Sequence, residues 1–556
     1  MIHLKQHLAD LPAILKQKGL EHVVISPGSR SAPLIASFYR VFGENCMSIA
    51  DERSAAYYAL GIALYTGKPV AIICTSGTAV LNYAPALAEA YYQQVPLLAI
   101  TADRVPEWID QQDNQTIRQQ NIYRSFVKKS FEMPVAMAST DNLWHAHRMA
   151  NEAFDLCLAP CKGPVHINIP LAEPLYDELP PVSENLRLID PIIPVTKPEL
   201  PAELEQEWNN ARSILIIHGQ DTPGSQTSLV LPALMADPRV VILAENIANI
   251  PAPGIISTSN LVLSNSRGNS PAHPDLVIHS GGQVVSKALA GYLRRAAHVK
   301  LWRVGTDNTL IDTYKQAART IHVPAHSLYH KLADMLQKGK QSDWSHEWHE
   351  LAENTRLKFT ETLSQLPFSD SVIFEHLFSS IPDNTLVVIG NSSVIRYSQL
   401  FSSNPSAHYY ANRGVSGIDG SLSTASGIAL ASGKPTLAIL GDISFLYDSN
   451  ALWNRELPQN LRIVVINNQG GGIFHILKGP SEKPGFKKLV EAHHPVNIHK
   501  LAEAYGLNYF CAGDLNSLAA VWPGFVNKNH TASVLEIETD PVISATAFRR
   551  LMNMWG

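Results

Sequence analysis

The chain has 556 residues, of which 45% are hydrophobic and 17% are charged, and its formal net charge is −5. This length predicts several domains, and the composition is sufficient to fill their cores. The slightly acidic balance gives no reason to expect a nucleic acid or an anionic membrane as a partner. No apolar stretch reaches the roughly 18 residues that a membrane span needs.

The cysteines and the N-terminal residues indicate the cellular compartment of the protein. The five cysteines are few, odd in number and without a Cys-x-x-Cys pair. This pattern is typical of reduced thiols rather than of a disulfide framework or a zinc site. Charged and polar side chains interrupt the first residues, which therefore do not resemble a secretory signal. We expect a cytoplasmic protein.

Short apolar, β-branched runs alternate with segments of helical length along almost the whole chain. Strands that alternate with helices predict parallel sheets with helices on both faces. We therefore expect an α/β fold of three doubly wound domains with mainly parallel sheets. The predicted strands are residues 23–25, 70–74, 97–100, 214–217, 240–243, 276–278, 299–302, 386–389, 436–440, 463–466 and 534–537.

Two boundaries separate these domains, which we place at residues 1–180, 200–340 and 350–556. Five prolines between Pro174 and Pro201 cannot lie inside regular helices or central strands, so this stretch predicts an extended linker. A polar stretch over residues 337–354 marks a softer second boundary.

The middle domain shows no dense polar cluster at its predicted strand ends, and we expect it to be largely structural. Lys287 follows the strand and turn that end at Gly282, and it is the best functional candidate there. A solvated helix lysine is the more common explanation of such a residue.

Polar clusters follow the predicted strands of the first domain. In residues 25–31, Gly28 permits a tight turn, the next helix start can hold an anion, and Arg30 offers a planar fork for carboxylate or phosphate. Asp51-Glu52-Arg53 opens a helix, where acidic residues are usually caps. Two further clusters are Thr75–Asn82 and Thr101–Arg104, the latter followed by Asn114, Gln115 and Arg118. Chance easily places one such cluster at a strand end, but not four.

Two strands of the last domain end in oxygen ligands. Gly441-Asp442 follows one predicted strand, and Asn467-Asn468-Gln469-Gly470-Gly471 follows the next. Open parallel sheets bind their ligands at the carboxyl ends of the strands. A carboxylate, an amide carbonyl and a backbone carbonyl freed by glycine suit a hard cation such as Mg²⁺, with room for phosphate oxygens.

This Gly-Asp…Asn-Asn spacing resembles the diphosphate-anchoring motif of the thiamine diphosphate enzymes, and residues 51–104 resemble their pyrimidine-binding domain. The resemblance implies that family's three-domain architecture, thiamine diphosphate as cofactor, and Mg²⁺ or Mn²⁺ as its metal. It implies that Glu52 donates a hydrogen bond to N1′ of the cofactor. The family's second motif usually reads Gly-Asp-Gly; here Ile443 replaces the last glycine, which costs backbone freedom but leaves Asp442 in place.

Seven motifs in order sharpen the resemblance to one subfamily, the 2-succinyl-5-enolpyruvyl-6-hydroxy-3-cyclohexene-1-carboxylate synthases of menaquinone biosynthesis. It implies decarboxylation of 2-oxoglutarate and conjugate addition of the remaining four-carbon fragment to isochorismate. It also implies a homodimer or homotetramer with active sites at the subunit interface. The motifs cover residues 26–30, 51–53, 75–79, 101–104, 390–396, 412–420 and 467–474.

The arginines favour such substrates independently, because several of them stand in or beside strand ends rich in Gly, Asn and Ser. A surface role is the usual one for each taken singly, but converging guanidinium groups suit substrates with two carboxylates. The catalytic and substrate-binding residues that we predict are Glu52, Arg30, Arg104, Arg396, Arg413 and, as further polar contacts, Asn114, Gln115 and Lys287.

The resemblance also assigns the cofactor site. The predicted metal ligands are Asp442, Asn468 and the Gly470 carbonyl, and Ile418 is the apolar wedge under the cofactor. Ile473, Phe474 and Leu477 form an apolar wall, for which ordinary helix core is an equally common explanation. The predicted cofactor-binding set is Glu52, Ser76, Gly77, Thr78, Ser392, Ser416, Gly417, Ile418, Gly441, Asp442, Ser444, Asn468, Gly470, Ile473 and Phe474.

Three other functions compete with this hypothesis. Another thiamine diphosphate carboligase or decarboxylase, such as an acetohydroxyacid synthase, would need fewer arginines. A protein that binds the cofactor without catalysis would not need Glu52, Asp442 and Asn468 together. A nicotinamide-dependent dehydrogenase ranks last, because the glycines at 414, 417 and 420 do not form its Gly-x-Gly-x-x-Gly fingerprint.

Overall fold

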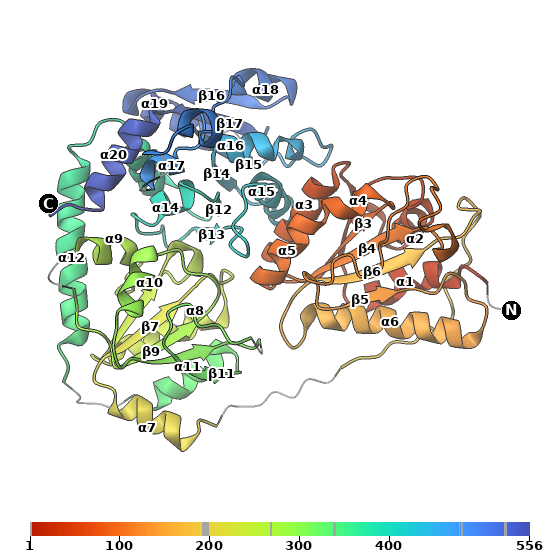
Figure 1. Ribbon diagram of the computed structural model, residues 1–556, viewed down its shortest axis with the longest axis horizontal. Coiled ribbons are helices and arrows are strands. Elements are labelled where there is room, and N and C mark those ends of the chain that lie inside the picture. Colours follow the sequence, from red (N-terminus) through yellow and green to blue (C-terminus); the bar gives the residue numbers. More distant parts are fainter. Residues whose placement is uncertain are drawn as a thin grey trace. The chain divides into compact units, whose positions relative to one another are not determined.

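The computed structural model describes residues 3–191, 199–266, 270–307, 309–336, 341–477, 479, 482–527 and 531–555. The chain forms two compact units. Unit 1 comprises Met1–Pro194, Asn412–Gly433 and Leu446–Gln459, and unit 2 comprises Val195–Ala411, Lys434–Phe445 and Asn460–Gly556. The described residues form three sheets, of six, five and six strands (Figure 1).

Sheet 1 lies in unit 1 and has the strand order β2-β1-β3-β4-β6-β5, with each neighbouring pair parallel. Its strands are β1 (His22–Ile25), β2 (Cys46–Ser48), β3 (Val70–Cys74), β4 (Leu97–Asp103), β5 (Ser130–Glu132) and β6 (Val165–Pro170). Helices cover both faces, as Figure 1 shows. On one face are α1 (Gln6–Gln17), α2 (Ala32–Phe42) and α6 (Thr140–Leu158), and on the other are α3 (Glu52–Thr66), α4 (Thr78–Asn82) and α5 (Ala84–Gln93).

Helix α3 also packs closely against α15 (Ser421–Ser432) within unit 1. A Cβ atom at Gly61 would lie 2.1 Å from the Thr424 carbonyl oxygen, and one at Gly427 would lie 2.1 Å from that of Tyr58. The two helix backbones can approach this closely only because glycine stands at both positions.

Sheet 2 lies in unit 2 and has the order β11-β10-β9-β7-β8, again with all neighbouring pairs parallel. Its strands are β7 (Ile214–His218), β8 (Val240–Ala244), β9 (Leu276–Ser280), β10 (Lys300–Val304) and β11 (Ala317–Ile321). Two apolar clusters pack on its opposite faces. One includes α7 (Ala202–Asn210), α8 (Gln226–Val230) and α11 (Ala325–Asp334), and the other includes α9 (Ser259–Asn265), α10 (Lys287–Arg294) and the start of α12 (Trp344–Leu363).

The expectation that this middle region lacks a polar cluster at its strand ends is wrong. His218, at the end of β7, contacts the Ser280 hydroxyl at 2.7 Å and the Asp221 carboxylate at 3.0 Å, and Ser280 contacts the Tyr329 hydroxyl at 2.6 Å. His218 and Ser280 end strands β7 and β9, whereas Asp221 lies in the loop after β7 and Tyr329 in α11, so their grouping is not evident from one stretch of the sequence. That the middle domain is largely structural stays a prediction.

Sheet 3 also lies in unit 2, and its order β13-β12-β14-β15-β17-β16 repeats the pattern of sheet 1. All its neighbouring pairs are parallel. Its strands are β12 (Leu386–Ile389), β13 (His408–Tyr410), β14 (Thr436–Gly441), β15 (Leu461–Asn467), β16 (Asn508–Ala512) and β17 (Ser533–Glu538). The helices of this region are α13 (Asp370–Ser380), α14 (Val394–Ser398), α16 (Asp442–Tyr447), α17 (Ile473–Ile476), α18 (Ile498–Ala504), α19 (Leu515–Asn527) and α20 (Pro541–Leu551).

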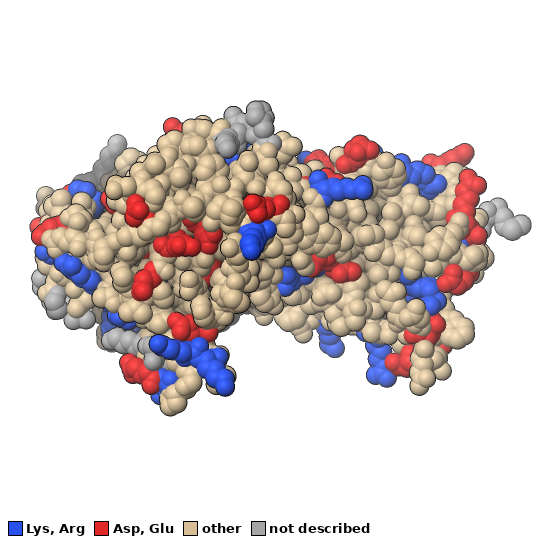
Figure 2. Space-filling view, turned by 90° about the horizontal axis from the view of Figure 1, so that it is seen from above, with Lys and Arg blue, Asp and Glu red and all other residues tan. Residues whose placement is uncertain are grey.

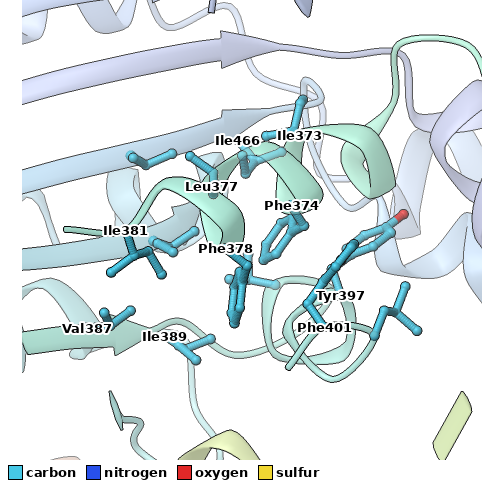
Figure 3. Close-up of a cluster of buried hydrophobic side chains, with 14 of the residues drawn as sticks. Ile373, Phe374, Leu377, Phe378, Ile381, Val387, Ile389, Tyr397, Phe401 and Ile466 are labelled. Carbon is cyan, nitrogen blue, oxygen red and sulfur yellow. The ribbon is translucent and has the colours of Figure 1, made fainter. Parts of the chain in front are cut away.

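The core of sheet 3 packs against β12 and β15, and the predicted metal ligands Asn468 and Gly470 follow β15. In Figure 3, α13 directs Phe374, Leu377 and Phe378 into a buried cluster with Ile389 of β12 and Ile466 of β15. Burial of these side chains supplies the main driving force for the packing, and it holds the carboxyl ends of β12 and β15 in place.

The predicted α/β class with parallel sheets is confirmed. Every predicted strand lies within an observed strand, apart from one residue: Val299, the first residue of the predicted strand 299–302, precedes β10. The predicted linker lies partly outside the described residues, at 192–198. Its described part, between β6 and α7, contains no helix or strand. Residues 337–340 of the second predicted boundary also lie outside the described residues. The three domain ranges stay predictions.

The surface charges are mixed, and the described helices lack the character of membrane spans. On the face drawn in Figure 2, Lys and Arg side chains are interspersed with Asp and Glu side chains. Within the described ranges, none of the helices combines the length and apolar character that crossing a bilayer would require.

Leu377→Ala tests the importance of the sheet 3 core. Leu377 is fully buried, so we expect the substitution to lower the free energy of unfolding by about 2–5 kcal/mol through lost burial and a new cavity. Urea denaturation measures this change. The same substitution at Leu357 of α12, which is 55% exposed, is the control and should stay within about 0.5 kcal/mol. Equal effects of the two variants would contradict the assignment of the core.

Candidate functional site

The four polar clusters of the first domain lie at one edge of sheet 1. They follow or end β1, β2, β3 and β4, which are neighbours in the sheet and run parallel, so their carboxyl ends share an edge. The strand order reverses direction between β1 and β3, and such switch points open a crevice for ligands. The residues after these two strands lie close together, because a Cβ at Gly28 would lie 2.4 Å from that of Thr75.

Glu52 is the first residue of α3. Its neighbour Asp51 caps this helix by accepting a 2.9 Å hydrogen bond from the Ser54 N–H, and it also accepts one at 2.5 Å from the Asn450 amide. The Glu52 side chain is half-buried. Burial raises the pKa of Glu52, and the nearby negative charge of Asp51 raises it further.

Residues Ser76 and Gly77 form a turn at the end of β3 that Gln115 covers. The Ser76 hydroxyl donates to the Gln115 carbonyl at 2.9 Å, and the Gln115 amide donates to the Ser76 carbonyl at 3.2 Å. Gly77 has a φ of +78°, and its N–H donates to the Gln119 side chain at 2.9 Å. Thr78 begins α4 with an exposed side chain. The turn therefore brings Gln115 to this edge of sheet 1, where it contacts Ser76, another predicted site residue.

Arg30 and Arg104 converge on one carboxylate. Arg30 is buried, and its guanidinium lies 3.0 Å from an oxygen of Glu173, while that of Arg104 lies 3.5 Å from the same oxygen. Arg104 also forms an ion pair with Asp113 at 2.7 Å. Nearby, Asn114 is exposed, and the Arg118 side chain is 81% exposed and paired with Asp110.

The loop that contains Arg413 and Ser416 is held by a buried carboxylate. Glu89 of α5 is fully buried and accepts hydrogen bonds from the N–H groups of Gly414, Val415 and Ser416 at 2.5, 2.8 and 3.3 Å. Burial raises the pKa of Glu89, although these three donors and the Arg413 charge act in the opposite direction. The loop continues through Gly417 and Ile418, which are both partly exposed.

At the carboxyl edge of sheet 3, Asp442 and Gly470 meet. Asp442 is 3% exposed and accepts a 2.8 Å hydrogen bond from the Gly470 N–H, and His494 lies 3.3 Å from the same carboxylate oxygen. Burial raises the pKa of Asp442. Gly470 has a φ of +109°, and a Cβ there would lie 2.2 Å from the Ala492 carbonyl oxygen, so the turn requires glycine.

Asn468 completes this group of oxygen donors. Its side-chain carbonyl oxygen is buried and accepts no hydrogen bond from the residues that the structure describes. Its side chain hydrogen-bonds to Asp370, which is fully buried and whose pKa burial raises to about 6. A buried amide oxygen without a donor is costly unless a ligand satisfies it.

These three residues fit a hard divalent cation. They offer a carboxylate, a buried amide oxygen and a turn in which glycine frees the backbone carbonyl, and such oxygen donors suit Mg²⁺ or Mn²⁺. The described residues hold no group of three or more His, Cys, Asp and Glu side chains that could bind a metal. The oxygen donors at the ends of β14 and β15 are thus a different kind of candidate metal site.

The remaining predicted residues of unit 2 differ in their placement. Ser392 follows β12 with a φ of +66°, and the Arg396 guanidinium donates to its carbonyl. Ser444 is buried in α16, next to Gly441 and Asp442. Ile473 and Phe474 begin α17, and Leu477 follows it. Lys287 is the exposed first residue of α10, beside sheet 2 rather than sheet 3.

The structure therefore groups most of the predicted residues into two sets, one in each unit, whereas Lys287 lies apart from both, beside sheet 2. The edge of sheet 1 gathers Arg30, Glu52, Arg104 and Gln115 with the Ser76–Thr78 turn, and the edge of sheet 3 gathers the oxygen donors with Ser392 and Ser444. Sequence reasoning missed several supporting residues. Glu89 offered a signal, because a lone acid in the apolar helix segment 84–90 is unusual. Glu173, Gln119 and Asp370 offered none, because their partners are distant in sequence.

Family models match three parts of the chain. The one described as the thiamine pyrophosphate enzyme, N-terminal TPP binding domain, matches residues 6–122; thiamine pyrophosphate is another name for thiamine diphosphate. The middle domain of thiamine pyrophosphate enzymes matches residues 206–389, and the C-terminal TPP binding domain matches residues 389–537.

Curated relatives carry one consistent description. A 2-succinyl-5-enolpyruvyl-6-hydroxy-3-cyclohexene-1-carboxylate synthase of Desulfotalea psychrophila is 40% identical over 97% of this chain and 99% of its own length. The enzymes with the same description from Flavobacterium johnsoniae and Porphyromonas gingivalis are 38% and 36% identical; the alignments cover 97% and 96% of this chain and 97% and 94% of theirs.

Among solved structures, benzoylformate decarboxylase from Polynucleobacter necessarius has a TM-score of 0.72 to this chain. The alignment covers 97% of this chain and 99% of that one, at 17% sequence identity. This likeness establishes the fold alone, which is the architecture of the thiamine diphosphate enzymes.

Proposed function

We infer the function from the family, because the chain belongs to the 2-succinyl-5-enolpyruvyl-6-hydroxy-3-cyclohexene-1-carboxylate synthases, a branch of the thiamine diphosphate enzymes. It decarboxylates 2-oxoglutarate and adds the remaining four-carbon fragment to isochorismate, a step of menaquinone biosynthesis. The observation that carries this proposal is near-complete coverage of relatives with one description at up to 40% identity.

In this proposal the edge of sheet 3 holds the metal and the diphosphate. Asp442, Asn468 and the Gly470 carbonyl bind Mg²⁺ or Mn²⁺, and Ser392, Gly441 and Ser444 lie beside the diphosphate. The buried Asn468 oxygen without a hydrogen-bond donor among the described residues supports this assignment. When bound, thiamine diphosphate supplies the nucleophilic carbon and the electron sink for decarboxylation.

In this proposal the edge of sheet 1 binds the pyrimidine half of the cofactor, and Glu52 there holds the proton that the cofactor needs. Protonated Glu52 donates a hydrogen bond to N1′ of the aminopyrimidine, beside Ser76, Gly77 and Thr78. The raised pKa of Glu52 supports this role, because the donor must carry its proton near neutral pH. Ser416, Gly417, Ile418, Ile473 and Phe474 provide the remaining contacts to the cofactor, with Ile418 beneath it.

Substrate carboxylates bind to arginines in this proposal. Arg30, Arg104, Arg396 and Arg413 supply the charge, and Asn114, Gln115 and Lys287 add hydrogen bonds. Planar guanidinium groups bind carboxylates through two parallel hydrogen bonds, which fixes orientation as well as charge. The convergence of Arg30 and Arg104 on the Glu173 carboxylate supports this use of the pair.

The assembly and the compartment follow from the family resemblance. We propose a cytoplasmic homodimer or homotetramer in which each active site forms at a subunit interface, so that an isolated monomer is inactive. The reduced cysteines predicted from the sequence agree with such a compartment.

An omission experiment tests the reaction. Purified protein is mixed with thiamine diphosphate, Mg²⁺, 2-oxoglutarate and isochorismate, and isochorismate absorbance and CO₂ release are followed while each component is left out in turn. Loss of isochorismate in the complete mixture alone is the expected result. CO₂ release with isochorismate untouched would indicate another thiamine diphosphate carboligase, and no reaction would overturn the proposal.

Asp51→Asn tests the protonation state that this role of Glu52 requires. The charge of Asp51 helps to raise the pKa of Glu52, whereas asparagine caps a helix about as well as aspartate. Wild-type kcat should fall as the pH rises through the raised pKa of Glu52, because its carboxyl then loses the proton. In Asp51→Asn this decline should begin at lower pH. A pH profile of kcat measures it, and an unchanged or upward-shifted decline would contradict the role.

A further inference from the structure

Arg30 and Arg104 already hold a carboxylate that belongs to the chain itself. A single oxygen of Glu173, Oε1, lies 3.0 Å from Nη2 of Arg30 and 3.5 Å from Nη1 of Arg104. Glu173 stands shortly after β6, between the buried residues Leu171 and Leu175. The backbone on both sides is therefore anchored, while the side chain reaches to the surface.

Neither arginine depends on Glu173 for its orientation. Nη1 of Arg30 donates to the Leu171 carbonyl at 3.0 Å, and the N–H of Leu171 donates in turn to the Asp103 carbonyl at 3.0 Å. Arg104 has its own anchor, because its Nε lies 2.7 Å from the Asp113 carboxylate. Each arginine therefore has a partner besides Glu173: a hydrogen bond to a backbone carbonyl for Arg30 and an ion pair for Arg104. Glu173 adds charge neutralisation to the pair.

The contact with Glu173 is also easy to displace. The Glu173 side chain is 60% exposed, and ion pairs of exposed side chains are weak. Only one of its two carboxylate oxygens takes part, whereas a ligand carboxylate placed in the fork of a guanidinium can use both. Asp113, the other carboxylate that contacts these arginines, is harder to displace than Glu173, because its side chain is only 26% exposed.

We propose that Glu173 is an internal competitor for the carboxylate-binding site of Arg30 and Arg104. A substrate that brings its own carboxylate displaces Glu173 and engages both arginines. A ligand without a carboxylate at that position leaves Glu173 in place and gains nothing from the pair, so Glu173 contributes to selectivity for dicarboxylates. The inference rests on the proposed function in one respect, that these arginines face a substrate.

Glu173→Gln in the holoenzyme tests this proposal, because glutamine keeps the shape and removes the charge. We expect the KM for one of the two substrates, isochorismate or 2-oxoglutarate, to fall about two- to five-fold, the range of an exposed ion pair, with kcat unchanged. Glu178→Gln is the matched control: it removes the same charge five residues further along, at an exposed position without an ion pair among the described residues. Both its Michaelis constants should equal those of the wild type.

Two outcomes would overturn the proposal. A higher KM in Glu173→Gln would mean that Glu173 positions the arginines, and unchanged KM values for both substrates would mean that it does not compete. If the wild type is inactive with these substrates, the proposed function fails, and calorimetric titration with glutarate still tests Glu173. Tighter glutarate binding by Glu173→Gln than by Glu178→Gln would support the competition, and equal or weaker binding would refute it.

Discussion

Glu52→Gln is expected to lower kcat by about 10²- to 10⁴-fold, the usual contribution of a positioned proton donor or acceptor. Glutamine matches the size of glutamate and can donate a hydrogen bond, but it cannot release or regain a proton at the cofactor. The half-buried side chain at the first position of α3, with a pKa raised by burial, is suited to carry that proton. Steady-state kinetics with both substrates measures the loss.

The binding of the cofactor separates this role from a structural one. In the proposal the metal and diphosphate site of sheet 3 holds thiamine diphosphate, so its Kd, followed by tryptophan fluorescence, should change little in Glu52→Gln. Glu44→Gln is the control, because Glu44 is exposed and lies two residues before β2, at the opposite edge of sheet 1. A kcat within ten-fold of the wild type, or a loss of kcat that only follows lost cofactor binding, would reject the assignment.

The sequence predicted the strands and their ends well because both signals are local. Buried parallel strands are continuous apolar runs, and the polar residues that follow them stand out. Asp442 and Asn468 could be placed at one edge for this reason, since β14 and β15 are parallel neighbours. The glycines after β15 indicated a backbone carbonyl freed by glycine, and in the structure Gly470 has a φ of +109°.

The long-range contacts of the site residues could not be predicted from local sequence patterns. Glu89 holds the loop at residues 414–416 across more than 300 positions of sequence, and Glu173 reaches Arg30 across 143. Neither pair has a local pattern. An arginine at a strand end suggests an anion, but the sequence alone does not distinguish a substrate carboxylate from one that the chain supplies. A negatively charged partner of Arg30 was thus predictable, and the ion pair that Arg30 forms with Glu173 was not.

Asp442→Asn is expected to weaken the binding of Mg²⁺ and of thiamine diphosphate together, by about 100-fold or more. Loss of a partner that only orients a metal ligand costs about 10- to 100-fold, and a ligand that carries charge should cost at least as much. Asparagine keeps the size and one oxygen that can accept the Gly470 N–H, now 2.8 Å from the carboxylate, so the turn should survive. The variant therefore removes charge with little change in shape.

The dependence on metal concentration distinguishes this loss from misfolding. Thiamine diphosphate is titrated by fluorescence at several Mg²⁺ concentrations; in Asp442→Asn the half-saturating Mg²⁺ should rise, and a large excess of Mg²⁺ should restore part of the binding. A misfolded variant would not recover at any concentration. Asp383→Asn provides the control, because this exposed aspartate precedes β12 at the opposite edge of sheet 3. Equal Mg²⁺ requirements in the wild type and Asp442→Asn would exclude Asp442 as a metal ligand, since a buried carboxylate in that role cannot lose its charge without changing the affinity for a divalent cation.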